Sequence, residues 1–194
     1  MIVDDFLTGP EELALDDSGT QPGHATGTML GSQRRTRLGV IARQGQRASL
    51  SIGPGPSSTG RLLVSTGVDT LATAELTYGV NAQDGPAPLN LDVTPFDRFA
   101  IDFSFIDFAV NVNIVAFTPE GWAASGHNVN QFLTPGTVGQ VLTQDFLFSE
   151  FGGPGRGFRQ IDALVAIFSF FGPIGGNDYQ VEGIRLENGS APVT

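Results

Sequence analysis

The sequence contains no cysteine and no lysine. Without cysteine the chain has no disulfide, no thiolate nucleophile and no cysteine-ligated zinc. All ten basic residues are arginine, so no lysine is present to form a Schiff base or to act as a compact phosphate-binding charge. These absences remove several classes of enzyme before any motif is considered.

Positive charge is also scarce, because twenty acidic residues outnumber the ten arginines and the net charge is −10. The one basic cluster consists of Arg34, Arg35 and Arg37. Nucleic acids and anionic membranes are bound by clustered positive charge that displaces counterions. We therefore expect no nucleic-acid partner and no attraction to an anionic membrane surface.

Long apolar runs are missing as well. The longest apolar-rich stretch, residues 161–171, is interrupted by Asp162 and Ser169 and has the length of a strand, so no transmembrane segment is expected. The first residues, Met1 to Phe6, lack the basic and apolar regions of a signal peptide. An extracellular or cell-surface location, which we predict, would need a leader that was removed before this numbering begins.

What the chain does contain is glycine, proline and phenylalanine, at 26, 12 and 15 residues of 194. Glycine and proline favour turns, and stretches of strong helix formers are almost absent. A hydrophobic content of 40% is enough to build a core. The composition predicts a single domain over residues 1–194 with many turns and few helices.

Several segments have the alternating pattern of strands. Residues 99–105 place large apolar side chains on one face, and residues 110–117 are expected to form a hairpin with residues 122–125 through a turn at 118–121. Residues 161–171 are apolar at both parities, which is typical of an interior strand covered on both faces. Residues 179–186 form the last expected strand, with a bulge at Gly183.

The first half of the chain is less regular. Residues 37–42 and 48–52 are expected to pair as a hairpin, whereas residues 7–27 show no sustained periodicity and are interpreted as a long loop or arm. Altogether about ten short strands without crossover helices predict an all-β fold, a two-sheet antiparallel sandwich of jelly-roll type.

Three segments carry a resemblance to known domains: residues 3–6 (VDDF), 161–164 (IDAL) and 178–186 (DYQVEGIRL). They resemble galactose-binding-like jelly-roll domains of the carbohydrate-binding-module and complex I intermediate-associated type. Residues 26–34 (TGTMLGSQR) also resemble a stretch found in uncharacterised secreted bacterial proteins. The resemblance implies a jelly-roll fold and export from the cell.

The same resemblance implies a structural calcium ion between the first and last strands, for which Asp4, Asp5 and Asp178 are the candidate ligands by position. Calcium prefers oxygen ligands, and the chain offers many carboxylates. Trp122, Tyr78 and Tyr179 are the candidates for stacking on a sugar ring. The alternative for these aromatics is a place in the core or at its rim.

Catalytic motifs are weak. Asp17-Ser18-Gly19-Thr20 has the order seen in aspartic proteases, but it follows a charged residue and has no second copy, so a turn is expected. The two histidines, His24 and His127, accompany no nucleophile elbow. A glycosidase-type carboxylate pair stays open as an alternative to our expectation that the chain is not an enzyme.

Two functional hypotheses follow from these observations. In the first, the protein is an extracellular structural or adhesive module that assembles with copies of itself or other surface proteins into a matrix or filament, using exposed strands or the arm at 7–27. In the second, it is a carbohydrate-binding module that recognises a glycan on one face of a sheet.

Overall fold

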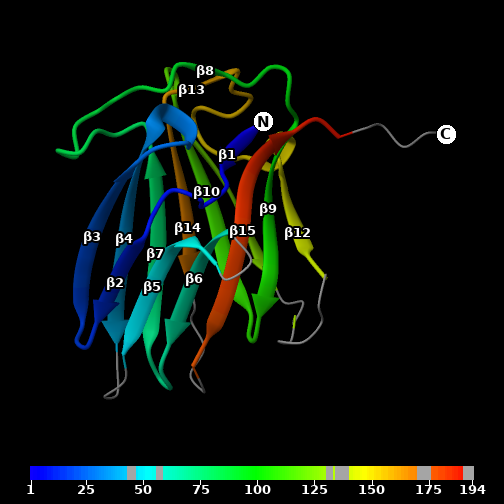
Figure 1. Ribbon diagram of the computed structural model, residues 1–194. Helices are drawn as coiled ribbons and strands as arrows, with labels where there is room; N and C mark the ends of the chain where they lie inside the picture. The colour runs from blue at the N-terminus through cyan, green and yellow to red at the C-terminus, as the bar shows by residue number, and fades with distance from the viewer. Residues whose placement is uncertain (43–46, 56–58, 130–132, 134–139, 170–175, 190–194) are drawn as a thin grey trace.

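The computed structural model describes residues 1–42, 47–55, 59–129, 133, 140–169 and 176–189, and it shows two antiparallel sheets stacked face to face (Figure 1). The first sheet has the strand order β12 (Leu142–Leu147), β9 (Arg98–Ile106), β15 (Asp178–Glu187), β6 (Gly60–Thr66), β5 (Ala48–Pro54), β2 (Glu11–Leu15). Its seventh strand, β1 (Ile2–Asp4), pairs with β15.

The second sheet has six strands in the order β11 (Gly121–Val129), β10 (Val110–Thr118), β14 (Ala163–Ser169), β7 (Leu71–Tyr78), β4 (Gln33–Ala42), β3 (Gly19–Thr26). A small pair, β8 (Leu91–Asp92) and β13 (Gln160–Ile161), lies at the upper end of the sandwich in Figure 1. Two short 3-10 helices, η1 (Leu30–Ser32) and η2 (Phe148–Glu150), complete the elements of the described residues. None of the helices in this part of the chain could cross a membrane.

This architecture confirms the predicted all-β, two-sheet antiparallel sandwich. The described residues form fifteen strands rather than about ten, because several short strands and the segment 7–27 were not anticipated. Within the strand expected over 161–171 the structure has β14, and residues 170 and 171 lie outside the described part.

The interpretation of residues 7–27 as a long loop or arm is wrong. The segment contains β2, which pairs with β5 at an edge of the first sheet, and β3, which pairs with β4 at an edge of the second. The side chains of β3 alternate only between half-buried and exposed, because an edge strand covers little of the core. Its sequence therefore lacks the apolar alternation by which a strand is recognised.

The predicted hairpin between residues 37–42 and 48–52 is also wrong. Both segments are strands, but β4 pairs with β3 and β7 whereas β5 pairs with β2 and β6, so the connection passes from one sheet to the other. Alternation identifies a strand without saying which strand it pairs with.

Predictions that depended on local signals are confirmed. The strands β10 and β11 form the expected hairpin through Thr118 and Gly121. The pairing of β15 with β9 shifts between Val181 and Gly183, where the bulge was expected. The strand β14 is interior to its sheet, between β10 and β7, but only its face toward the first sheet is buried, so the expected cover on both faces is wrong.

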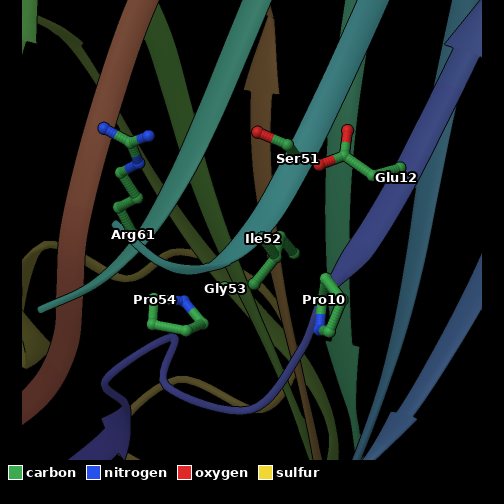
Figure 2. Close-up of a pocket in the computed structure, with 7 residues that line it drawn as sticks. All are labelled: Pro10, Glu12, Ser51, Ile52, Gly53, Pro54 and Arg61. Carbon is green, nitrogen blue, oxygen red and sulfur yellow. The ribbon is translucent and has the colours of Figure 1, made fainter. Parts of the chain in front are cut away.

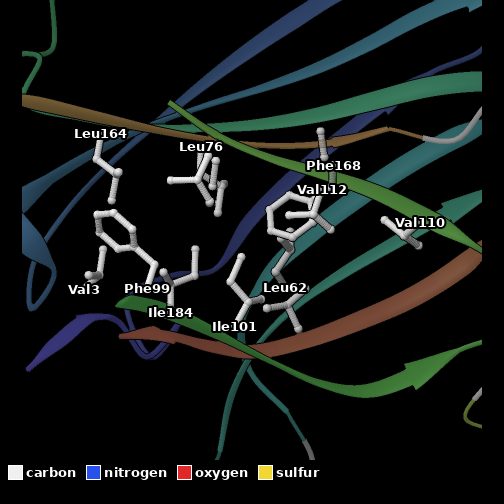
Figure 3. Close-up of a cluster of buried hydrophobic side chains, with 14 of the residues drawn as sticks. Val3, Leu62, Leu76, Phe99, Ile101, Val110, Val112, Leu164, Phe168 and Ile184 are labelled. Atoms are coloured by element: carbon white, nitrogen blue, oxygen red, sulfur yellow. The ribbon is translucent and has the colours of Figure 1, made fainter. Parts of the chain in front are cut away.

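The core fills the space between the sheets (Figure 3). Phe103 on β9 and Phe168 on β14 meet edge to face across it, with 6.3 Å between their ring centroids. Phe168 also stacks on Tyr179 of β15 at 5.9 Å. Facing side chains from both sheets surround these rings, among them Val3, Leu62, Phe99, Ile101 and Ile184 from the first sheet, and Leu76, Val110, Val112 and Leu164 from the second.

Candidate functional site on the outer face of the second sheet

Two aromatic side chains lie next to each other on the surface of the second sheet. Phe117, near the end of β10, is paired across the hairpin with Trp122, near the start of β11. The turn between them is fixed by Thr118, whose hydroxyl donates to the carbonyl oxygen of Gly121 at 3.0 Å. Phe117 is 44% exposed and Trp122 is 48% exposed, although both have apolar rings. We call this pair the aromatic platform.

An apolar strip continues from the platform across the sheet. Val115 lies two residues before Phe117 on β10 and pairs with Val165 of β14, and Ala163 of β14 pairs with Phe117. Ile167 follows on the same face of β14, since side chains two residues apart in a strand share a face. All four of these aliphatic residues are half-buried and face away from the first sheet. The platform and these four residues form the apolar half of the outer face.

Uncharged polar side chains border the apolar half at the end farther from the β10–β11 turn. Asn111 and Asn113 are exposed on β10, and Asn128 is exposed on β11 directly opposite Asn111. Each amide offers both donors and an acceptor.

Charged side chains border the apolar half on its other side. Ile167 pairs with Glu75 of β7, and Glu75 pairs with Arg37 of β4. The Glu75 carboxylate accepts hydrogen bonds from Arg37 at 2.6 Å and from Arg35 at 3.4 Å, and Arg35 also reaches Asp84 at 3.3 Å. Because the guanidinium groups are held by carboxylates, they are fixed before any ligand arrives. Three distances between neighbouring strands separate β11 from β7, so the face is about 15 Å wide.

The structure exposes one of the three aromatics proposed to stack on sugar. Trp122 is on the outer face, whereas Tyr78 is 0% exposed and Tyr179 is 3% exposed, both inside the sandwich. Burial raises the pKa of both phenols above the ordinary value. The interpretation of Tyr78 and Tyr179 as sugar-stacking residues is therefore wrong, because neither ring presents a face to solvent.

The predicted calcium ligands do not converge. Asp4 lies opposite Ile184 in the pairing of β1 with β15, six residues along β15 from Asp178, a separation of about 20 Å. Asp5 instead accepts the backbone N–H of Leu7 at 3.1 Å. In the described ranges, no three acidic or histidine side chains gather in a geometry that could hold a metal ion. The ligand set Asp4, Asp5 and Asp178 is wrong.

A guanidinium group pairs with Asp4 inside the sandwich. Arg34, which is fully buried, donates to Asp4 Oδ2 at 2.7 Å, to Glu11 Oε2 at 3.2 Å and to the carbonyl oxygen of Thr8 at 3.2 Å. The Tyr78 hydroxyl donates to Asp4 Oδ2 at 2.9 Å. Burial alone would lower the pKa of Arg34, but attraction to Asp4 and the other neighbours outweighs it and raises that pKa.

This arrangement predicts that calcium is not needed for stability. We expect the melting temperature to be the same in calcium-containing buffer and in EDTA, because the negative charge of Asp4 is already compensated by Arg34. Differential scanning calorimetry of the protein in the two buffers checks this. A rise of several degrees on adding calcium would contradict it and would indicate ligands other than the predicted three.

The outer face of the first sheet offers a less suitable site. A depression of about 200 Å³ lies between the start of β2, the end of β5 and the start of β6, with Glu12, Ser51 and Arg61 as its polar side chains (Figure 2). Sites for small molecules usually have about 300–1,000 Å³ and an apolar lining. The depression also has one carboxylate, whereas glycosidic hydrolysis by the usual mechanism needs two.

Most residues of the outer face were missed in the sequence. Residues 161–171 are apolar at both odd and even positions, and this pattern was interpreted as a strand buried on both faces. In the structure the outward side chains of Val165 and Ile167 stay half-buried at the surface. One signal could have found the site. The outward-facing residues of β14 are apolar although no other segment of the chain is predicted to cover them, and they lie next to the exposed Phe117 and Trp122. The basic cluster is likewise explained, because Arg34, Arg35 and Arg37 all pair with carboxylates.

These observations define an antiparallel β-sandwich with an open aromatic face. Neither a protein-family model nor a curated protein matches the sequence. Among solved structures, the chain is similar to the family 11 carbohydrate-binding module of the cellulosomal cellulase Lic26A-Cel5E of Clostridium thermocellum, with a TM-score of 0.47 and 11% identity over 100% of this chain and 97% of that chain.

Two further structures show the same likeness. One is a family 28 carbohydrate-binding module specific for non-crystalline cellulose, with a TM-score of 0.46 and 14% identity over 72% of this chain and 80% of that chain. The other is a family 11 module from Clostridium thermocellum in complex with a β-1,3-1,4-mixed-linked tetrasaccharide, with a TM-score of 0.44 and 15% identity over 78% and 88%. At 11–15% identity the likeness goes no further than the arrangement of the β-sandwich.

Proposed function

We propose that the protein is a carbohydrate-binding module whose outer face on the second sheet binds an extended glycan. The observation that carries the proposal is the exposed aromatic platform, Phe117 and Trp122, continuous with an apolar strip and bordered by polar groups. A sugar ring has apolar C–H faces and a polar rim, so it suits a surface that offers aromatic rings beside hydrogen-bonding groups.

The polar borders supply the second half of that match. Asn111, Asn113 and Asn128 carry donors and acceptors, and the carboxylate of Glu75 is held by Arg35 and Arg37. Groups that are already fixed lose little conformational freedom on binding, which favours affinity. A glycan of several residues could contact both borders while its rings lie on the apolar half.

Self-assembly is the second candidate. It was suggested by an apparent arm at residues 7–27, and the fold weakens that argument. The segment 7–27 is built into both sheets. The edges it forms are poor templates for pairing, because the Gln21 side chain accepts the N–H of Ala14 at 2.8 Å and Pro22 has no N–H to donate. The exposed aromatic platform is what still favours assembly, since an apolar patch can also bury itself against a second copy.

The proposal places the protein outside the cell or on its surface, where it would meet extended polysaccharides. Fractionation of the producing cells, with detection of the protein by antibody, tests this part. Recovery from the cytosol alone would contradict the extracellular location.

The proposed function predicts that Trp122→Ala strongly weakens glycan binding, enough to remove retardation in a gel, while leaving the fold intact. Removing a central aromatic anchor usually costs about 2 kcal/mol or more, a loss of roughly thirtyfold in affinity. Affinity electrophoresis in gels containing β-glucans, mannans, xylans, galactans or uronic-acid-containing polysaccharides measures the retardation. Phe108→Ala is the matched control, because Phe108 is a comparably exposed phenylalanine at the β9–β10 turn.

The outcomes separate the two candidates. Retardation of the wild type and of Phe108→Ala, but not of Trp122→Ala, supports glycan binding. If no gel retards the wild type and light scattering shows an oligomer that Trp122→Ala dissolves, glycan binding is wrong and self-assembly through the outer face replaces it.

A further inference from the structure

A cavity of about 380 Å³ lies beside the aromatic platform, at the end of the sandwich that carries the β10–β11 turn. One wall is the turn itself, with Pro119 and Glu120, and the other is the loop that leads into β13. That loop contributes the apolar ring of Phe158 and the side chains of Arg156 and Arg159. The volume is in the range of small-molecule sites, unlike the depression on the first sheet.

The loop is held on both sides. Gly152 exchanges two backbone hydrogen bonds of 2.9 Å with Ala124 of β11, and the N–H of Gly155 donates to the carbonyl oxygen of Trp122 at 3.0 Å. At the far side Phe158 packs on Phe148 and Phe151, with centroid distances of 5.1 and 5.4 Å. Anchors at both sides make the cavity a formed feature of the fold.

The same loop also holds the platform. Gly153 has a φ of +126°, and a Cβ on it would lie 3.1 Å from two ring atoms of Trp122, so the loop backbone packs directly against the indole. The next residue, Pro154, lines the cavity, so one loop both touches the indole of Trp122 and forms a wall of the cavity. The platform and the cavity can act on one ligand.

The charge of the cavity is unusual for this chain. Six other arginines form ion pairs with carboxylates, although in the described residues Arg156 and Arg159 form none and are both exposed. Acidic residues are twice as numerous as basic ones in the sequence, so partners of opposite charge are plentiful elsewhere. The backbone of Arg159 is fixed by the N–H of Val93, which donates to its carbonyl oxygen at 2.8 Å.

We propose that this cavity is a subsite for an anionic substituent of the bound glycan, either a uronic-acid carboxylate or a sulfate ester. Arg156 and Arg159 donate charge-assisted hydrogen bonds to the anion while the neighbouring sugar ring stacks on Trp122. The inference rests on the proposed function and deepens it, because it names acidic glycans as the preferred ligand class. Glu120, on the opposite wall, disfavours polyanions of high charge density and leaves room for a single acidic group.

The test is a glycan array that carries neutral, uronate-containing and sulfated glycans, probed with the wild type, Arg156→Gln/Arg159→Gln and Arg61→Gln. Arg61 is the matched control, since it also lacks an ion pair among the described residues but lines the depression on the first sheet. We expect acidic glycans to bind most strongly. The double variant should lose about tenfold or more of its affinity for them and keep its affinity for neutral glycans.

Esterified and desulfated forms of the strongest binders, titrated calorimetrically, then show whether a carboxylate or a sulfate occupies the cavity. Equal binding of acidic and neutral glycans, with the double variant like the wild type, overturns the subsite. If Trp122→Ala still abolishes binding in that case, the proposed function stands without it. Absence of any binding on the array overturns both.

Discussion

Arg34→Met is expected to destabilise the fold by about 3–5 kcal/mol, because it leaves Asp4 and Glu11 buried without the charge that compensates them. Arg34 and Asp4 are fully buried, and the side chain of Glu11 is 8% exposed. Methionine retains most of the apolar stem, so the loss is chiefly electrostatic. Urea unfolding followed by tryptophan fluorescence gives the free energy of unfolding.

The cluster spans the core, which explains the size of the effect. Asp4 and Glu11 belong to the first sheet, whereas Arg34, Thr36 and Tyr78 belong to the second. The Thr36 hydroxyl donates to Glu11 Oε2 at 3.0 Å. Arg34 also lies over the ring of Phe6, with 5.8 Å between the guanidinium carbon and the ring centroid. Losing the guanidinium removes the positive charge that joins the sheets here and leaves only the hydroxyl groups of Thr36 and Tyr78 to bridge them.

A rescue experiment separates charge from packing. In Arg34→Met/Asp4→Asn/Glu11→Gln the uncompensated carboxylates are gone, although the amide oxygen introduced at position 4 can still accept from Tyr78, so we expect much of the stability to return. Arg34→Lys should fall between the wild type and Arg34→Met, because one ammonium group cannot reproduce the planar fork that serves both carboxylates. A triple variant no more stable than Arg34→Met would show that the loss is one of packing.

The parts of the fold that the sequence predicted are those governed by neighbours along the chain. The β10–β11 hairpin combines a clear alternation with turn residues at 118–121, and both signals are local. The pairing of β4 and β5 depends on strands far away in the sequence, and it was predicted wrongly. The edge strand β3 was missed because Pro22 and Gly23 interrupt a segment with little to bury.

The candidate site shows the same limit. Residue type alone pointed to Trp122, Tyr78 and Tyr179, but type does not determine burial. The alternation along a strand predicts burial better. Tyr78 lies at an even position of β7, on the same face as the buried Ala72, Ala74 and Leu76. The role of Arg34 could not be predicted, because its partners Asp4 and Glu11 reach it only when the two sheets close.

The second large effect is expected at Gly79, just after β7 and beside the start of β14. Its φ is +89°, and a Cβ there would lie 2.5 Å from the carbonyl oxygen of Asp162 and 2.9 Å from the Cα of Ala163. Gly79→Ala therefore combines left-handed strain of about 1–2 kcal/mol with overpacking of about 1–3 kcal/mol. We expect a total loss of about 2–5 kcal/mol in the free energy of unfolding, measured in urea.

Gly157→Ala is the matched control, because Gly157 also has a positive φ, +73°, but nothing lies within 4 Å of its Cβ position. Gly157→Ala should lower the free energy of unfolding by the backbone strain alone. The difference in stability between the two variants then measures the clash with β14. The clash would also move Ala163, which pairs with Phe117 of the aromatic platform. Gly79→Ala should consequently weaken glycan binding at temperatures where it is still folded, whereas equal stability losses in both variants would show that β14 yields freely at this point.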